Sequence, residues 1–339
     1  MKDENILEAK SQLNWADYTT GLVTPKTIWR RLNHQGHRFY FSKINDKIET
    51  AIGITSVIDL AFGESKFLRE WKDSRPEWKK DLKLMADYGT LLHAAFGELI
   101  KTGIVPQYFI EIADKTFSKK LQFKKDLLSL KKFLVDYKVE VIFLEGILAK
   151  EYTSKNGTKS YICSAIDLFG TIEMPIKTKE LVEDGEYVRG EKKGEKKYKE
   201  VTAVTYERVN AIIDLKSNYD HKDAKSFFES HKYQLIFGKE LIESEFDVSD
   251  VRMFNLSTLG WSKEPKFVLT EHRDDTNRLG YKDSEILSNR INTCMIENKL
   301  QPNGMIYEIS DEITMESTND MRVLSYEEMA EETLNNLNN

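Results

Sequence analysis

Residues 201–217 read VTAVTYERVNAIIDLKS, and their apolar end, IIDLK at 212–216, decides both the fold and the chemistry that the sequence predicts. Strand side chains point alternately to two faces, so Asp214 and Lys216 share one face and their apolar neighbours share the other. A carboxylate and an ammonium group therefore lie together at the end of an apolar strand. Such a pair can hold a divalent cation and orient an attacking water, and an exposed ion pair is the alternative.

A second carboxylate, Asp167, lies in a similar apolar run, AIDL at 165–168. If the two strands are neighbours, Asp167 and Asp214 can converge on one cation, because unpaired charges are costly in an apolar setting. The alternative for Asp167 alone is a strand-end residue that begins a turn. The matched contexts of the two aspartates favour a shared cation site.

A histidine on the preceding helix extends this site. In GTLLH at 89–93, Gly89 and His93 share a helix face, and the missing side chain at Gly89 lets a sheet or a substrate approach His93. A ring nitrogen of His93 can bind a metal, and Glu145, in the first predicted strand, can add a carboxylate. A packed helix histidine and an exposed strand glutamate are the respective alternatives.

The flanking sequence predicts helices around a three-strand meander. Helical spacing of apolar residues predicts helices at 76–101, 123–137, 224–243 and 283–298. β-Branched and aromatic residues predict short strands in 37–58, ending in ITSVID, and further strands at 139–150, 160–172, 201–217 and 250–256. Asn156-Gly157 predicts a hairpin turn between the first two strands of the meander.

Charged residues crowd into the segment between Asp167 and Asp214, at 177–200, which predicts an exposed hairpin or loop. We expect this hairpin to lie near the site and to grip a phosphate backbone, with a solvated loop of mixed charge as the alternative. The cations concerned are Arg189, Lys192, Lys193, Lys196, Lys197 and Lys199.

The composition sets limits on function. The chain of 339 residues has 50 basic and 56 acidic residues, so its net charge is −6, which argues against a protein that coats nucleic acid nonspecifically. We therefore expect basic character to be local, around Asp214 and residues 189–199. The longest runs without a charged residue, 88–97 and 253–262, are too short for a membrane span, and the apolar start of a secretory signal is missing. A cytoplasmic location without a membrane partner is predicted.

The order of the motifs GTLLH, Glu145, AIDLF, IIDLKS and YQLIFG, on helix, strand, strand, strand and helix, resembles the PD-(D/E)XK nuclease superfamily. It is most similar to the RecB and lambda-exonuclease-like branch, and ITSVID resembles a segment that precedes the GxxxH helix in phage-encoded members. The resemblance covers residues 37–257. It depends on the order of the motifs, because no single motif is specific.

The resemblance implies metal-dependent hydrolysis of DNA phosphodiesters, with Mg²⁺ or Mn²⁺ as the cofactor. By this resemblance the metal ligands are His93, Asp167, Asp214 and the carbonyl of Leu215, and the catalytic residues are Lys216, Asp214, Asp167, Glu145 and Gln234. Lys216 would serve the attacking water, and Gln234 matches the Q-motif of the branch. Tyr233 beside it offers a ring for stacking on a base, and core packing of this ring is the alternative. The acidic residue of the (D/E)-x-K signature is Asp214 here.

Cofactors found in some relatives are not expected. The two cysteines, Cys163 and Cys294, cannot supply a four-cysteine iron–sulfur cluster, and no GxxxxGK[ST] nucleotide-binding motif occurs. The expected partner is DNA, with a single-strand annealing or recombination protein as a candidate protein partner. If the chain is phage-encoded, the host cytoplasm is its expected location.

The predicted fold is α/β (α+β), a restriction-endonuclease-like core with a central mixed sheet flanked by helices. Its predicted parts are an N-terminal helical elaboration (1–75), a nuclease core (76–260) with a charged hairpin insertion (177–200), a strand and helix extension (261–326) and a flexible tail (327–339). The predicted function is a deoxyribonuclease, and the resemblance favours an exonuclease in recombination, repair or phage DNA processing. The alternatives are a structure-specific endonuclease and a noncatalytic DNA-binding or protein-interaction module.

Overall fold

The computed structural model describes residues 25–34, 37–45, 47–64, 66–117, 121–186, 188–192, 195–217 and 229–297, so the predicted tail at 327–339 lies outside the described residues. Its strands are β1 (Arg30–His34), β2 (His37–Ile44), β3 (Lys47–Gly53), β4 (Glu140–Thr153), β5 (Lys159–Glu186), β6 (Lys196–Lys216), β7 (Arg252–Leu259) and β8 (Lys266–His272). Its helices are α2 (Ile54–Phe62), α3 (Lys66–Asp73), α4 (Trp78–Thr102), α5 (Gln107–Thr116), α6 (Gln122–Asp136), α7 (Glu229–Phe246) and α8 (Asp283–Ile296).

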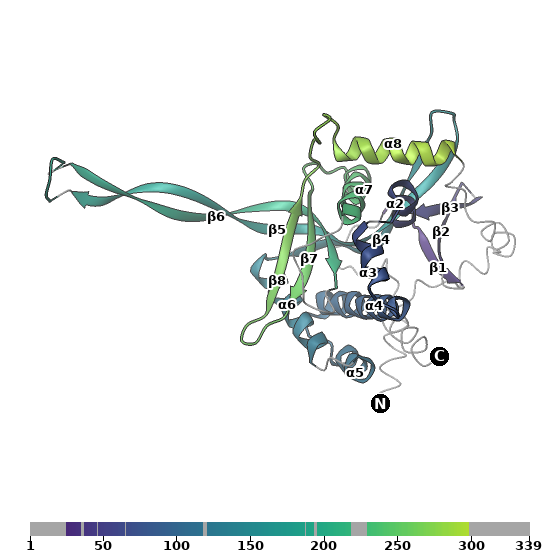
Figure 1. Ribbon diagram of the computed structural model, residues 1–339, viewed down its shortest axis with the longest axis horizontal. Coiled ribbons are helices and arrows are strands. Elements are labelled where there is room, and N and C mark those ends of the chain that lie inside the picture. The colour runs from purple at the N-terminus through teal and green to yellow at the C-terminus, as the bar shows by residue number, and fades with distance from the viewer. Residues whose placement is uncertain are drawn as a thin grey trace.

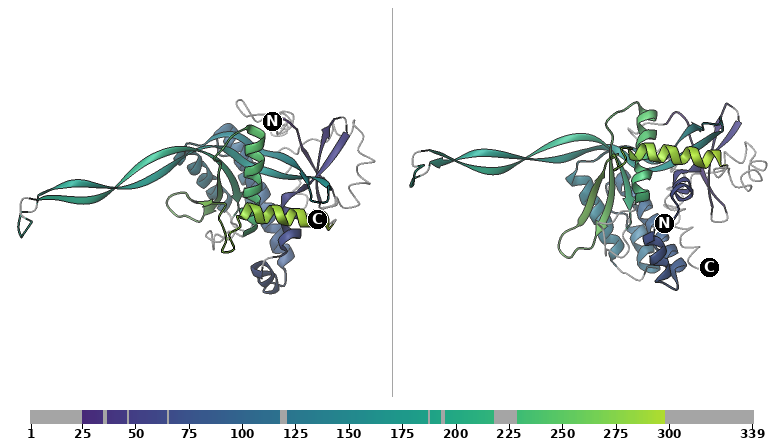
Figure 2. Two further views of the ribbon diagram at one scale, coloured as in Figure 1. Left: turned by 90° about the horizontal axis from the view of Figure 1, so that it is seen from above. Right: turned by 45° about the horizontal axis from the view of Figure 1, so that its top comes forward.

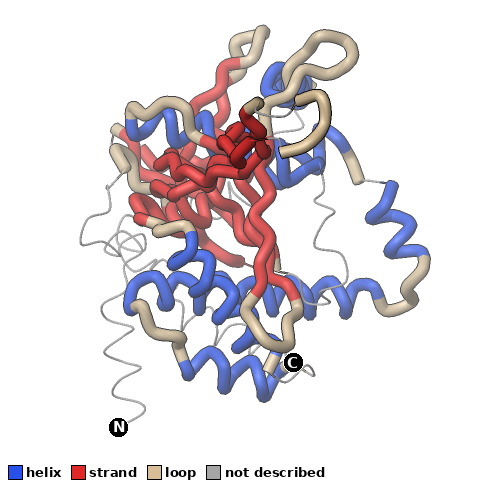
Figure 3. Tube along the Cα trace, turned by 90° about the vertical axis from the view of Figure 1, so that its left-hand side faces the viewer, coloured by secondary structure: helices blue, strands red, loops and turns tan. Residues whose placement is uncertain are grey.

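The body of the molecule consists of a mixed sheet between two layers of helices (Figures 1 and 3). Seven of the eight strands follow the order β1-β2-β3-β5-β6-β7-β8, and the eighth, β4, pairs with β5. Helices α4, α5 and α6 pack on one face, and α2, α7 and α8 pack on the other. The predicted mixed α/β fold is therefore confirmed.

The strands of the predicted meander, β4, β5 and β6, form antiparallel pairs in sequence order. Consecutive residues of β6 are buried on opposite faces of the sheet. Ile213 and Leu215 face α4 and α6, whereas Ile212 packs with α7. A strand that is covered on both faces is apolar at consecutive positions. This explains the run before Asp214.

Two strands meet end to end along one edge of β5. Strand β3 runs parallel to β5 and pairs with it at residues 161–163, whereas β6 runs antiparallel and pairs from Leu168 onward. Between these ladders, residues 164–167 have no ladder partner on that edge among the described strands, while β4 pairs with the other edge. Asp167 thus lies at a gap in the sheet, where the end of β6 turns toward β7.

Two expectations for the N-terminal part are wrong. The ITSVID segment is the start of helix α2, not a strand end, because Ile54, Val57 and Ile58 fall on one helix face and are all buried. The described part of residues 1–75 is also not mainly helical, since β1, β2 and β3 precede α2 and extend the central sheet.

Two glycines bring helices close to the strands that carry Asp167 and Asp214. A Cβ atom at Gly89 of α4 would lie 2.9 Å from the Ser217 hydroxyl oxygen, directly after β6. A Cβ atom at Gly238 of α7 would lie 2.6 Å from Cδ1 of Ile212. The close approach expected at Gly89 is therefore present, and a second one supports the opposite layer.

Strands β5 and β6 continue far beyond the body as a two-stranded antiparallel ribbon (Figures 1 and 2). We call residues 176–207 the arm; its ladder extends to the pair Glu186 and Lys196. The described side chains of the arm are exposed, except for the partly buried Val201 and Ala203. The predicted exposed hairpin is confirmed, and it is an extension of two core strands rather than a separate loop.

Gly170→Ala is expected to destabilise the fold by about 3 kcal/mol, the upper part of the range for overpacking. The new Cβ would lie 2.2 Å from the Glu140 backbone oxygen, so β4 and β5 would have to separate. Urea unfolding of both proteins measures the effect. Gly280→Ala is the control, because Gly280 has a positive φ of 86° but open space around it and should cost only about 1–2 kcal/mol. Equal losses in the two variants would contradict the packing argument.

Candidate functional site

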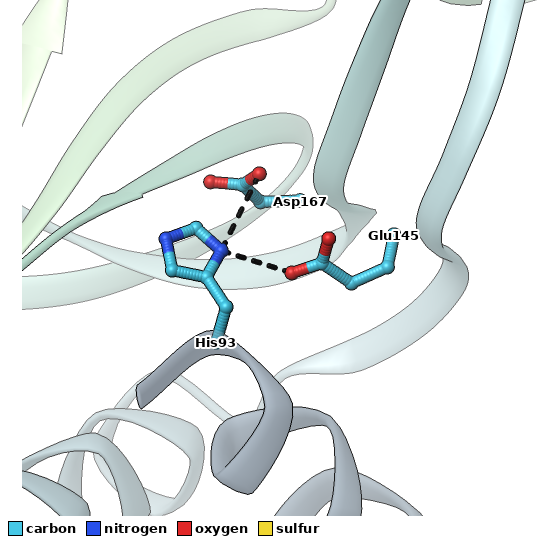
Figure 4. A group of neighbouring side chains, drawn as sticks. All are labelled: His93, Glu145 and Asp167. Carbon is cyan, nitrogen blue, oxygen red and sulfur yellow. Dashed lines mark hydrogen bonds and ion pairs between the residues drawn. The ribbon is translucent and has the colours of Figure 1, made fainter. Parts of the chain in front are cut away.

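Three side chains from three elements meet at the gap in the sheet (Figure 4). His93 comes from α4, Glu145 from β4 and Asp167 from β5. The Nδ1 atom of His93 lies 2.9 Å from Oε1 of Glu145 and 3.6 Å from Oδ1 of Asp167. One donor atom from each residue lies within 4.8 Å of the others, so the group is compact enough to enclose one ion.

Strand β4 has an irregular backbone at Glu145, where this residue lies beside Asp167. The flanking pairs are Leu144 with Leu168 and Gly146 with Ile166, so Glu145 lies across from Asp167. Glu145 has a φ of 48°, which is unusual for a residue with a side chain. The next position must be a glycine, because a Cβ at Gly146 would lie 1.9 Å from Cζ of Phe143. Such local strain is typical of functional sites.

The backbone of Leu215 connects the group to the end of β6. Its amide donates to Oδ2 of Asp167 at 2.8 Å, and its carbonyl oxygen lies 3.0 Å from Nε2 of His93. A carbonyl can only accept, so Nε2 donates. The Leu215 carbonyl therefore contacts the ring nitrogen of His93 that does not face the two carboxylates, and its role as a metal ligand stays a prediction.

The His93 imidazole carries the positive charge that two buried carboxylates need. Burial would lower the pKa of His93, but Asp167 and the hydrogen-bonded Glu145 raise it to about 9. Burial also raises the pKa of Asp167, and His93 opposes this shift. The proton on His93 thus takes the place of a cation among the carboxylates.

Asp214 lies beside this group and has different partners. Its two carboxylate oxygens lie 2.9 and 2.8 Å from Nζ of Lys216, and Nδ2 of Asn255 donates to the same carboxylate. Gln234 of α7 completes the arrangement, with Oε1 3.4 Å from Nζ of Lys216. Burial raises the pKa of Asp214 to about 6, although Lys216 opposes the shift. The convergence of Asp167 and Asp214 on one ion stays a prediction.

Asn255 is a polar residue of this arrangement that the sequence did not indicate. It lies on β7, is fully buried, and is the register partner of Asp214 in the parallel pair of β6 and β7. Its amide fixes the orientation of the Asp214 carboxylate. The run MFNLS does not distinguish this asparagine from an ordinary strand residue. Its place in the site follows only from the register between β6 and β7.

The donor set fits Mg²⁺ or Mn²⁺. Two carboxylates and one imidazole nitrogen are mainly hard oxygen ligands, as these ions prefer. The residues that would hold the ion are His93, Glu145 and Asp167, and the predicted roles of Asp214 and the Leu215 carbonyl as further ligands stay predictions.

Tyr233 does not offer a free ring for a base. It is only 4% exposed, and its ring stacks on that of Phe62 with centroids 4.3 Å apart. The ring thus packs α7 against α2, which was the alternative interpretation for this residue. The base-stacking role predicted for Tyr233 would need a different side-chain position.

The cations of the arm are not near the site. At about 3.3 Å per residue, the strand from Asp167 to the end of β5 at Glu186 extends for roughly 60 Å. Carboxylates on the facing strand also pair with the lysines, since Lys196 contacts Glu183 and both Lys197 and Lys199 contact Asp184. The expectation of a basic hairpin beside Asp214 is therefore wrong in its placement. Arg189 and Lys192 lie in the tip, and Lys193 lies outside the described residues.

The apparent Mn²⁺ affinity is expected to rise with pH, by up to about tenfold per unit for one displaced proton, between neutral pH and the His93 pKa of about 9. Below that pKa the His93 proton competes with the cation, and above it the competition ends. Titration calorimetry in buffers of different ionisation enthalpy counts the released protons. His93→Gln is the control and should bind weakly with a flat pH dependence. A wild-type affinity that does not change with pH would contradict the prediction.

Comparisons with known proteins leave the family open. No family model matches the chain, and no curated protein matches it. The solved crystal structure of SSO0001 is similar over 67% of this chain and 88% of that chain, with 11% sequence identity and a TM-score of 0.24. A likeness at this level carries no argument about fold or function.

None of the described helices has the length and apolarity to cross a membrane.

Proposed function

We propose that the protein is a Mg²⁺- or Mn²⁺-dependent deoxyribonuclease that hydrolyses phosphodiester bonds, and that it acts as an exonuclease. The observation that carries this proposal is the compact group of His93, Glu145 and Asp167 beside the pair of Asp214 and Lys216. A cytoplasmic location and a role in recombination, repair or phage DNA processing belong to the same proposal.

The roles of the side chains follow from their contacts. His93, Glu145 and Asp167 would hold the ion, which when bound polarises the phosphate and lowers the pKa of water. Asp214 orients the Lys216 ammonium, because both carboxylate oxygens lie within 2.9 Å of Nζ. The ammonium can then position the attacking water and offset the charge that develops on the phosphate.

Gln234 and Asn255 support this pair from opposite sides. The Gln234 amide oxygen restricts the ammonium of Lys216 from α7, and the Asn255 amide holds the Asp214 carboxylate from β7. A charged group that is held by fixed neighbours stabilises charge on the reacting phosphate without a reorganisation cost. The arrangement suits phosphoryl transfer to water.

The test incubates the protein with linear duplex and single-stranded DNA in the presence of Mn²⁺. Release of nucleotides from either substrate by the wild type, with loss in Asp214→Ala and Lys216→Ala, is the expected result. Degradation of neither substrate by the wild type, or wild-type activity in both variants, would overturn the proposal.

Two further measurements separate the alternatives. Cleavage of closed circular DNA would indicate an endonuclease, because an exonuclease needs an end. DNA binding without Mn²⁺ binding in calorimetry would indicate a noncatalytic module. An exonuclease should leave the circular DNA intact and should bind Mn²⁺.

A further inference from the structure

The arm has two free backbone edges. Beyond Thr171, β5 pairs only with β6 among the described strands, and before Ala211, β6 pairs only with β5. A strand edge without a neighbour presents unpaired N–H and C=O groups that can add another strand. A two-stranded hairpin by itself is at best marginally stable in water. The free edges therefore allow the arm to pair with another chain, and such pairing would stabilise it.

The arm carries several apolar side chains that no described residue buries. Among the described residues, seven of the fifteen exposed large hydrophobic residues lie on it. Leu181 is 72% exposed, Val188 81% and Tyr206 64%. The other four are Ile176, Val182, Tyr198 and Val204. Exposed apolar residues that gather in this way mark a protein contact surface.

The charge of the arm favours a protein over a nucleic acid as its partner. Residues 176–207 contain eight basic and eight acidic residues, so their net charge is zero. Lys199, and less strongly Lys197, hold the pKa of Asp184 below its usual range, so these two lysines already pair within the arm. A surface for a phosphate backbone has an excess of cations instead.

The order of charges along β5 indicates which protein fits. Lys177 and Lys179 lie toward the body, whereas Glu183, Asp184 and Glu186 lie toward the tip. With Leu181 at the centre, an identical strand that runs antiparallel to this one places Lys179 of each copy opposite Glu183 of the other. A two-fold axis that relates two copies produces such a self-complementary contact.

We propose that the arms of two copies of this chain pair along their β5 edges and form a dimer with a four-stranded ribbon. Leu181 lies on the two-fold axis and faces its own copy. Lys179, Leu181 and Glu183 share one strand face, so each Lys179 lies opposite Glu183 of the other copy. This dimer does not depend on nuclease activity.

Sedimentation equilibrium over a range of micromolar concentrations tests the proposal, because mass reports association whatever the activity. The wild type is expected to be a dimer, and Leu181→Asp a monomer with an unchanged circular dichroism spectrum. The control is Leu279→Asp, at an exposed leucine outside the arm, which should stay dimeric. A monomeric wild type, or a Leu181→Asp protein that stays dimeric, would overturn the proposal.

A charge exchange identifies the contact. Lys179→Glu alone and Glu183→Lys alone place like charges opposite each other in a homodimer, so each variant should be a monomer. Mixing the two variants restores two Glu–Lys contacts and should restore the dimer. The lost pairs within each arm, Lys179 with Glu200 and Lys196 with Glu183, stay lost in the mixture and therefore cannot explain recovery. No recovery on mixing, or variants that lose affinity for duplex DNA while they keep the wild-type mass, would contradict the pairing.

Discussion

Asp167→Asn is expected to lower Mn²⁺-dependent DNA hydrolysis by about 10²–10³-fold, the usual effect of removing one preorganised electrostatic contact. The charge of Asp167 raises the pKa of His93, and its Oδ2 accepts the Leu215 amide at 2.8 Å. Asparagine keeps an oxygen that can accept this bond but removes the charge. The variant should therefore fold normally, bind Mn²⁺ weakly and have a His93 pKa below about 9.

Steady-state rates, Mn²⁺ calorimetry and NMR titration of His93 measure these three effects. Asp136→Asn is a matched control, because this carboxylate pairs with Lys132 at 2.7 Å on the surface of α6. The control should have the wild-type rate and Mn²⁺ affinity. Wild-type Mn²⁺ affinity in Asp167→Asn would show that the ion binds elsewhere, and our assignment of the site would be wrong.

Lys216→Met is expected to lower the rate by a similar factor, about 10²–10³-fold, for a different reason. Lys216 is not a ligand in the proposed site, so Mn²⁺ should still bind near neutral pH. Lys216 also lowers the pKa of Asp214, so its loss should raise that pKa further above about 6. Protonation of Asp214 then extends to higher pH, which NMR titration of its carboxyl group measures.

The control for this variant is Lys232→Met. Lys232 is another partly buried lysine, on α7, and it pairs with Asp283 and Asp275 instead of the site. Its loss should affect stability and leave the pKa of Asp214 at about 6. A wild-type rate in Lys216→Met would remove this lysine from the proposed mechanism.

Much of the core could be predicted because its strands are buried on both faces and its helices on one. These two patterns give the continuous apolar run before Asp214 and the helical spacing in α4 and α6. ITSVID was different, since its β-branched residues favour a strand whereas the spacing of Ile54, Val57 and Ile58 is that of a helix face. Packing of α2 against α7 and α8 decides between these structures, and no local pattern contains that information.

The site could be predicted in its residue types but not in its contacts. The motifs identified His93, Glu145 and Asp167 one by one, and the structure brings them together. The hydrogen bonds of Asp214 depend on the register between β6 and β7, which places Asn255 beside it. The position of Glu145 depends on the irregularity in β4. Register and strand irregularities follow from the whole sheet, so a segment read alone could not reveal them.

Because β3 and β6 meet end to end, the N-terminal strands and the rest of the sheet should differ in how readily they open. Strands β1, β2 and β3 join the rest of the sheet through three residue pairs, at Ala51, Ile52 and Gly53, whereas β5 and β6 share a much longer ladder. The three N-terminal strands can therefore open as one cooperative unit while the helical layers stay packed. In native-state hydrogen exchange their amides should exchange by sub-global opening, and those around Leu168 and Ile213 only with global unfolding. The candidate site then lies at the boundary between a slowly and a rapidly exchanging part of one sheet.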